Sequence, residues 1–92
     1  MNAQDIQDAL GTLKGWELDG DAIKKTWSFR DFKEAMSFIN QVAELAERFN
    51  HHPELFNVYN RVTLRFTTHD AGGLTEKDFA IAREIDQLSP QT

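Results

Sequence analysis

One long amphipathic segment constrains the fold most: DFKEAMSFINQVAELAERFN, at residues 31–50. Asp31 can cap a helix at its start, and Glu34 three residues later completes a capping-box pattern. Apolar residues then recur at the spacing of one helix face. We expect the helix to end near Asn50, because Pro53 disfavours helical geometry in the residue before it. This helix is the clearest element of the chain.

The apolar residues of this segment cover about half of the helix circumference at 100° per residue. Seven of them form one stripe: Phe32, Ala35, Met36, Ile39, Val42, Ala43 and Ala46. Phe38, Leu45 and Phe49 widen this stripe along one edge. One sheet face does not require so broad a surface. The helix either packs deep in a small core or presents the extra edge to another subunit. The second explanation is favoured, because so small a domain has little stability to spare.

On each side of this helix the sequence indicates a β-hairpin. GWEL and AIKKTWSF, at residues 15–18 and 22–29, flank the turn signal DGD. Further along, residues 56–66 alternate between apolar and polar side chains. Asn60-Arg61 between the two halves predicts a tight turn, since Asn tolerates positive φ. One continuous long strand is the alternative.

Shorter helices are expected near both ends of the chain. Residues 3–13 form a candidate first helix. Thr75 begins a T-x-x-D capping signal for a last helix that runs to about Leu88. Only residues 89–92 (SPQT) suggest a loose tail. The sequence therefore predicts a single α+β domain over residues 1–92, in which an antiparallel sheet carries helices on one face, in the order α-β-β-α-β-β-α.

The composition argues against several classes of function. The net charge is −5, so the chain lacks the overall basic footprint of a nucleic-acid-binding protein. It has no cysteine, which rules out disulfides, thiolate metal sites and a thiol nucleophile. The N-terminus, MNAQDIQDALGTL, has no signal-peptide pattern, and no apolar run approaches the roughly 20 residues of a membrane span. We expect a cytoplasmic protein that binds neither nucleic acid nor membrane.

Five polar residues do not fit an ordinary surface. His51 and His52 follow the long helix, and His69 ends the second hairpin. Glu47, at the edge of the apolar stripe, is either a solvated surface acid or a carboxylate that orients an imidazole. Asp78 falls at the centre of the buried stripe of the last helix. It either serves the N–H groups of the helix end or lines a cleft with its carboxylate.

Two kinds of chemistry use such a set of side chains. Three imidazoles with a carboxylate could hold zinc, although the adjacent histidines lack the i, i+4 spacing of a helical zinc motif. The other chemistry is acid–base catalysis, because an imidazole titrates near pH 6.5 and both accepts and donates a proton near neutrality. No serine or cysteine nucleophile is paired with these histidines.

The pattern Glu47-x3-His51-His52-Pro53-x5-Tyr59-x9-His69-x8-Asp78 resembles the signature of the pterin-4a-carbinolamine dehydratases. The resemblance covers roughly residues 16–88. It implies a four-stranded antiparallel sheet with helices packed on one face, in agreement with the order of elements above. It also implies a homodimer or homotetramer joined through sheet edges and the long middle helix.

The implied reaction is loss of water from 4a-hydroxytetrahydrobiopterin to give quinonoid dihydrobiopterin. This step recycles the pterin cofactor of aromatic amino acid hydroxylases such as phenylalanine hydroxylase, and it needs no metal and no further cofactor. His51 and His69 are then the expected acid–base residues, and which of them acts as base depends on the face of C4a that carries the hydroxyl. His52 completes the catalytic set and orients the pterin. The implied substrate-binding residues are Glu47, His51, His52, Pro53, Thr68, His69, Asp70, Ala71 and Asp78.

Two positions depart from the family pattern. Leu55 stands where close relatives often carry tryptophan, and Asn50 stands where many carry aspartate. These departures concern pocket affinity more than reaction type. The alternative function is a non-enzymatic one, because animal relatives also serve as a dimerisation cofactor for a homeodomain transcription factor. The intact histidine set favours the enzyme.

Overall fold

The computed structural model describes residues 1–88, so the SPQT tail lies outside the described residues. Its elements are α1 (Ala3–Leu10), β1 (Glu17–Asp19), β2 (Ala22–Ser28), α2 (Phe32–Phe49), β3 (Glu54–Val58), β4 (Arg61–Phe66), the 3-10 helix η1 (His69–Ala71) and α3 (Glu76–Asp86). Apart from the short η1, this order confirms the expected α-β-β-α-β-β-α arrangement. Within residues 1–88, none of the helices has the length and apolar character needed to cross a membrane.

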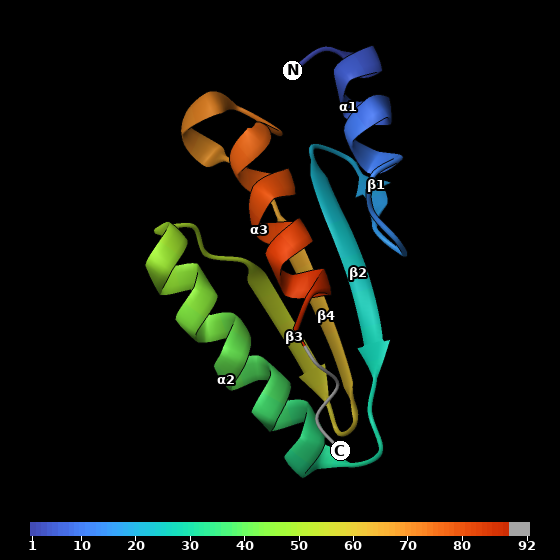
Figure 1. Cartoon of the computed structure of the whole chain (residues 1–92), viewed down its shortest axis with the longest axis vertical. Helices are drawn as coiled ribbons and strands as arrows, with labels where there is room; N and C mark the ends of the chain where they lie inside the picture. The colour runs from blue at the N-terminus through green and yellow to red at the C-terminus, as the bar shows by residue number, and fades with distance from the viewer. Residues whose placement is uncertain (89–92) are drawn as a thin grey trace.

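The four strands form one antiparallel sheet in the order β1-β2-β4-β3. Figure 1 shows α2 and α3 side by side over one face of this sheet. The central strand β4 alternates strictly: Val62, Leu64 and Phe66 are fully buried beneath the helices, and the residues between them are not. The α+β fold with helices on one sheet face is therefore confirmed.

The extra edge of the α2 apolar surface packs inside the chain itself, so the expectation that this edge meets another subunit is wrong, whereas Phe32 and Ala43 of the stripe are exposed. Phe38 and Leu45 are each only 5% exposed, and Phe49 packs against the same core. The ring of Phe38 lies between Trp27 and Phe29, with centroid distances of 4.8 and 5.0 Å. Trp27 of β2 and Phe29, which follows β2, thus cover the part of the α2 surface around Phe38.

Both hairpins are present, and the turn of the second lies one residue earlier than predicted. Val58 pairs with Arg61, which leaves Tyr59-Asn60 as the loop, and the positive φ (50°) falls on Tyr59. Asn60 instead joins this turn to the end of β2. Its Nδ2 donates to the Phe29 carbonyl at 2.8 Å, and the Phe29 N–H donates to the Asn60 carbonyl at 2.8 Å. The single long strand considered as an alternative does not occur.

The first helix is shorter than predicted. It ends at Leu10 rather than residue 13, and single turns follow in which the N–H groups of Thr12 and Leu13 donate three residues back. Asn2 caps its start, accepting from the Asp5 N–H at 2.8 Å. Ile6, Ala9 and Leu10 of this helix are partly buried and pack against the core.

The open face of the sheet is held by Arg65 on β4. Its guanidinium donates to Asp19 Oδ2 at 2.8 Å and to Glu54 Oε2 at 2.7 Å, so it links the first hairpin to β3. The hydrogen bond from Arg65 holds the pKa of Asp19 below its usual value. These groups are exposed to water, so the interaction fixes geometry more than it stabilises the fold.

A carboxylate near the end of α3 ties three parts of the chain together. Asp86 accepts hydrogen bonds from Trp16 Nε1 and from Lys25 Nζ. The side chains of Lys25 and Asp86 are both largely buried. We expect Asp86→Ala to lower the free energy of unfolding by about 1–3 kcal/mol, because it leaves two partly buried donors without an acceptor. Urea denaturation measures this change. Glu84→Ala, on the same helix, should be nearly neutral; an equal loss in both variants would contradict the prediction.

Candidate active site

The end of α2 sets the direction of both adjacent histidines. Asn50 adopts a left-handed conformation (φ 51°, ψ 46°), which asparagine tolerates better than most residues. The N–H of His51 donates to the Ala46 carbonyl at 2.9 Å, and that of Asn50 donates to the Glu47 carbonyl at 3.2 Å. This is the Schellman arrangement. Asparagine at position 50 therefore suits the turn that ends the helix.

His51 is buried and bound to a carboxylate. The residue as a whole is 8% exposed. Its ring stacks on the ring of Phe66, with the two centroids 5.7 Å apart and an angle of 23° between the ring planes. His51 Nε2 lies 2.5 Å from Asp78 Oδ1. When the carboxylate is ionised it only accepts, so Nε2 must carry the hydrogen. In the neutral ring, Nδ1 is then the atom with a lone pair available to take a proton.

Asp78 is fully buried, as the helical pattern predicted, and of the two explanations offered for it the helix-end role is the one observed, because its carboxylate does not line the pocket. Its Oδ2 accepts the Thr75 N–H at 2.9 Å, which completes the capping box at the start of α3. The same oxygen accepts the Thr68 hydroxyl at 2.8 Å, while Oδ1 receives His51. The carboxylate thus caps its helix and supports a histidine of the pocket at the same time.

Two threonines extend this network. The hydroxyls of Thr68 and Thr75 lie 2.9 Å apart. Because Thr68 donates to the ionised Asp78, Thr75 must be the donor between the two hydroxyls. The backbones of Thr68 and Gly73 also exchange two hydrogen bonds of 3.2 Å, which fixes the loop that carries η1. Every polar group behind His51 therefore has a partner in a connected network.

His52 forms a second pair with a carboxylate, in water rather than in the core. Its Nε2 lies 2.5 Å from Glu47 Oε2, and the two side chains are 56% and 78% exposed. Glu47 thus lies against the imidazole of His52 and not that of His51. The turn at Asn50 explains the difference, since it directs His51 inward and leaves His52 beside the last turn of α2.

The three histidines line one pocket of ≈320 Å³, which confirms that the elements bring them together. His51 and His52 directly follow the end of α2, and His69 begins η1 after β4. The full lining is Asn50, His51, His52, Thr67, Thr68, His69, Asp70 and Lys77. His69 is exposed and differs from the other two histidines in that, within residues 1–88, no carboxylate is hydrogen-bonded to its ring.

Four residues expected to bind substrate do not line this pocket. Asp78 lies behind His51, and Glu47 lies outside His52, so each contacts the pocket only through a histidine. Pro53 sits at the entry to β3, and Ala71 is exposed at the end of η1. The spacing of a motif does not separate residues of the pocket wall from those that support it.

Lys77 and Thr67 line the pocket without having been predicted from the sequence. Lys77 precedes Asp78 in the first turn of α3, where helical periodicity indicates a solvated residue. Since the capping box directs Asp78 toward His51, the same helix start brings Lys77 to the rim. The T-x-x-D signal, taken together with the histidine cluster, was the available indication of this placement.

The arrangement suits proton transfer. Within residues 1–88, no group of three histidine or acidic side chains is placed to hold a metal ion. His51 and His52 each pair with a separate carboxylate. A buried imidazole held by Asp78 can accept a proton at Nδ1, and an exposed imidazole in the same pocket can exchange protons with water.

Known proteins resemble this chain along nearly its whole length. The family model described as pterin 4 alpha carbinolamine dehydratase matches residues 1–88. A candidate pterin-4-alpha-carbinolamine dehydratase of Opitutus terrae is 55% identical over 90 residues, covering 97% of this chain and 93% of its own. One from Sulfurisphaera tokodaii is 46% identical over 88 residues, covering 96% and 95%.

Solved structures show the same fold. A transcriptional coactivator/pterin dehydratase from Brucella melitensis superimposes with a TM-score of 0.89, at 41% identity and with 94% of each chain covered. A pterin dehydratase-like protein described as a RuBisCO assembly factor of the alpha-carboxysome gives a TM-score of 0.66 at 19% identity, with 84% of this chain and 89% of its own covered. The second likeness concerns the fold alone.

Proposed function

Since this chain belongs to the pterin 4 alpha carbinolamine dehydratase family, we propose that it removes water from 4a-hydroxytetrahydrobiopterin to give quinonoid dihydrobiopterin. The observation that carries the proposal is the buried His51–Asp78 pair, with its hydrogen bond of 2.5 Å, opening on a pocket shared with His52 and His69. The pocket has a volume of ≈320 Å³, at the lower end of the ~300–1,000 Å³ range of small-molecule sites.

In the proposed reaction His51 acts as the base. Its Nδ1 takes the proton from N5 of the pterin, and the electron pair of the N5–H bond forms the C4a=N5 double bond. Asp78 stabilises the imidazolium that results and keeps the ring in the tautomer that has its lone pair on Nδ1. The burial of Asp78 makes this support strong, because water does not screen it.

His69 acts as the acid. It gives a proton to the 4a-hydroxyl as the C4a–O bond breaks, so that the leaving group departs as water. Overall, one proton enters the protein at His51 and one leaves at His69, and exchange with solvent restores both. No electron is gained or lost. The exposure of His69 allows this exchange.

The remaining residues of the site hold the substrate. We assign His52, oriented by Glu47, to contact with the pterin ring, and Thr68 and Asp70 to the wall beside it. Lys77 adds a positive charge at the rim. Glu47 and Asp78 act through the histidines they hold, as positioning residues.

A direct assay tests the function. Phenylalanine hydroxylase generates 4a-hydroxytetrahydropterin, whose ultraviolet decay is followed with and without the protein. Accelerated decay is expected, and it would link the protein functionally to aromatic amino acid hydroxylases. If the decay keeps its spontaneous rate at micromolar protein, the chain lacks the activity despite its family.

We further propose that the chain forms a homo-oligomer through the edge of β3. Within residues 1–88 this strand pairs with β4 only, and its exposed apolar residues include Phe56 at 71% and Val58 at 59%. An open, apolar strand edge favours pairing with another strand. A short, twofold-symmetric contact between two copies would cover it.

Phe56→Lys is expected to lower the oligomeric state, because it places a charge in the middle of the proposed strand contact without touching the core. Light scattering coupled to gel filtration measures the mass. Leu18→Lys is the matched control, since Leu18 is 46% exposed on β1 at the other edge of the sheet. A mass that is the same for Phe56→Lys as for the unchanged protein would exclude this interface.

A protein-binding role is the second candidate function. The same exposed β3 surface favours it, and the Brucella melitensis relative is named as both coactivator and dehydratase. The two candidates separate in one experiment. If the pterin assay shows no acceleration while Phe56→Lys abolishes capture of a partner protein, binding through β3 is the function.

A further inference from the structure

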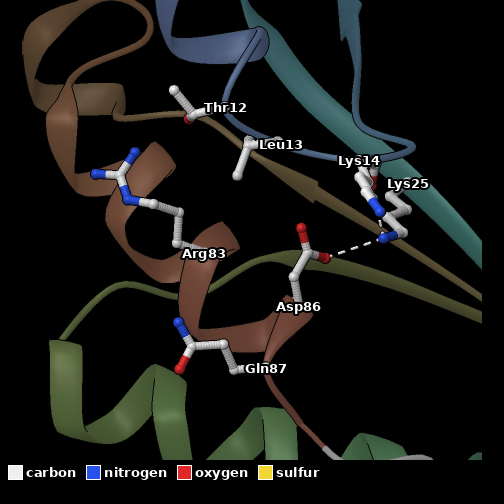
Figure 2. Close-up of a pocket in the computed structure, with 7 residues that line it drawn as sticks. All are labelled: Thr12, Leu13, Lys14, Lys25, Arg83, Asp86 and Gln87. Carbon is white, nitrogen blue, oxygen red and sulfur yellow. Dashed lines mark hydrogen bonds and ion pairs between the residues drawn. The ribbon is translucent and has the colours of Figure 1, made fainter.

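Figure 2 shows a second pocket. It shares no lining residue with the histidine pocket. It forms where the segment between α1 and β1 crosses the C-terminal half of α3. Its volume is ≈400 Å³, which is larger than the ≈320 Å³ of the histidine pocket. The proposed dehydration makes no use of it. A cavity of this size with several charged walls requires its own explanation.

One wall is a carboxylate in a fixed position. Asp86 Oδ1 accepts Trp16 Nε1 at 3.0 Å and Lys25 Nζ at 2.9 Å, and Lys25 also donates to the Lys14 carbonyl at 2.7 Å. Oδ2 accepts the same indole N–H at 3.1 Å. A carboxylate has about four acceptor sites. Oδ2 therefore keeps the capacity to accept a further donor from the pocket.

The other side of the pocket carries an arginine. Arg83 precedes Asp86 by three residues on α3, so the two share a helix face. Within residues 1–88 the ion pair of Arg83 is to Glu76, at 3.6 Å, and Asp86 pairs with Lys25 instead. Figure 2 shows the Arg83 guanidinium and the Asp86 carboxylate extending from α3 in different directions, with Leu13 between them in this view.

We propose that this pocket binds a free aliphatic α-amino acid. The planar fork of Arg83 holds the ligand carboxylate, and Asp86 Oδ2 accepts its ammonium group. The aliphatic side chain rests on Leu13. The lining carries three cations, Lys14, Lys25 and Arg83, against one carboxylate, so it repels a simple amine. A simple anion lacks the ammonium group that donates to Asp86 Oδ2. A zwitterion contacts both walls.

Leucine and two analogues test this proposal by nuclear magnetic resonance. The indole N–H of Trp16 reports binding directly, because it donates to the carboxylate that receives the ammonium. We expect a saturable shift of this resonance with L-leucine. 4-Methylpentanoate lacks the ammonium group and 3-methylbutylamine lacks the carboxylate, and each should bind about tenfold more weakly or worse. Equal binding of 4-methylpentanoate would overturn the assignment to amino acids.

A matched pair of arginine variants separates the site from the fold. Arg83→Gln should weaken leucine binding by about tenfold or more, because it removes a charged hydrogen bond. Arg48→Gln changes the basic residue in the last turn of α2 and should bind as the unchanged protein does. Two results would refute the site. One is no shift of the Trp16 indole resonance up to 10 mM leucine, which is roughly the weak limit of specific binding. The other is an equal loss of leucine binding in both variants. The readout does not depend on dehydratase activity.

Discussion

Replacing His51 by alanine is expected to slow pterin dehydration by about 10²–10⁴-fold, the usual contribution of a general acid or base. The variant removes the proposed base and leaves Asp78 Oδ1 without the partner it holds at 2.5 Å. Ultraviolet decay of the 4a-hydroxy substrate gives the rate, and kcat should fall more than KM rises, because the lost group acts on the reacting atoms.

Removing a buried histidine also affects stability, so a second variant keeps the prediction testable. His51→Ala leaves a buried acceptor unsatisfied, at a cost of about 1–3 kcal/mol. His51→Gln retains a donor for Asp78 and should recover most of this stability without recovering the rate. His52→Ala is the control at the neighbouring exposed position and should act mainly on KM. If His51→Ala and His51→Gln both dehydrate the substrate at the normal rate, His51 is not the base.

The elements of the fold could be predicted because each leaves a periodic signal. The alternation along β4 and the turn residues around Gly20 are local, and they placed both hairpins within a residue or two. The orientation of α2 could not be predicted in the same way. Its apolar arc is broad, and the choice between core and subunit contact depended on Trp27 and Phe29, which reach Phe38 from another part of the chain.

The candidate site shows the same division between local and distant information. Motif spacing identified the histidines that line the pocket, and periodicity identified Asp78 as buried. The pairing of Glu47 with His52 depends on one left-handed residue, Asn50, whose φ and ψ the spacing does not reveal. Lys77 reaches the pocket only because α3 begins there. Supporting contacts of this kind follow from how elements pack, which no single segment encodes.

Asp78→Asn tests whether the buried carboxylate fixes the tautomer of His51, and we expect it to slow dehydration by about 10²–10⁴-fold. The amide oxygen of asparagine still accepts from Thr68 and from the Thr75 N–H, which lie 2.8 and 2.9 Å from Asp78 Oδ2. The amide nitrogen then faces His51 Nε2. Since it donates, it forces the hydrogen of the ring onto Nδ1, and the lone pair turns away from the substrate.

This change of tautomer separates catalysis from folding. In Asp78→Asn every buried hydrogen bond keeps a partner, so urea denaturation should show only a small loss of stability. Asp78→Ala removes all three acceptor contacts and should be destabilised by about 1–3 kcal/mol for each donor left unpaired. Nitrogen chemical shifts of the His51 ring report the tautomer directly. Two outcomes for Asp78→Asn would show that Asp78 serves the helix cap alone. Either Nε2 of His51 stays protonated, or the variant dehydrates the substrate at the normal rate.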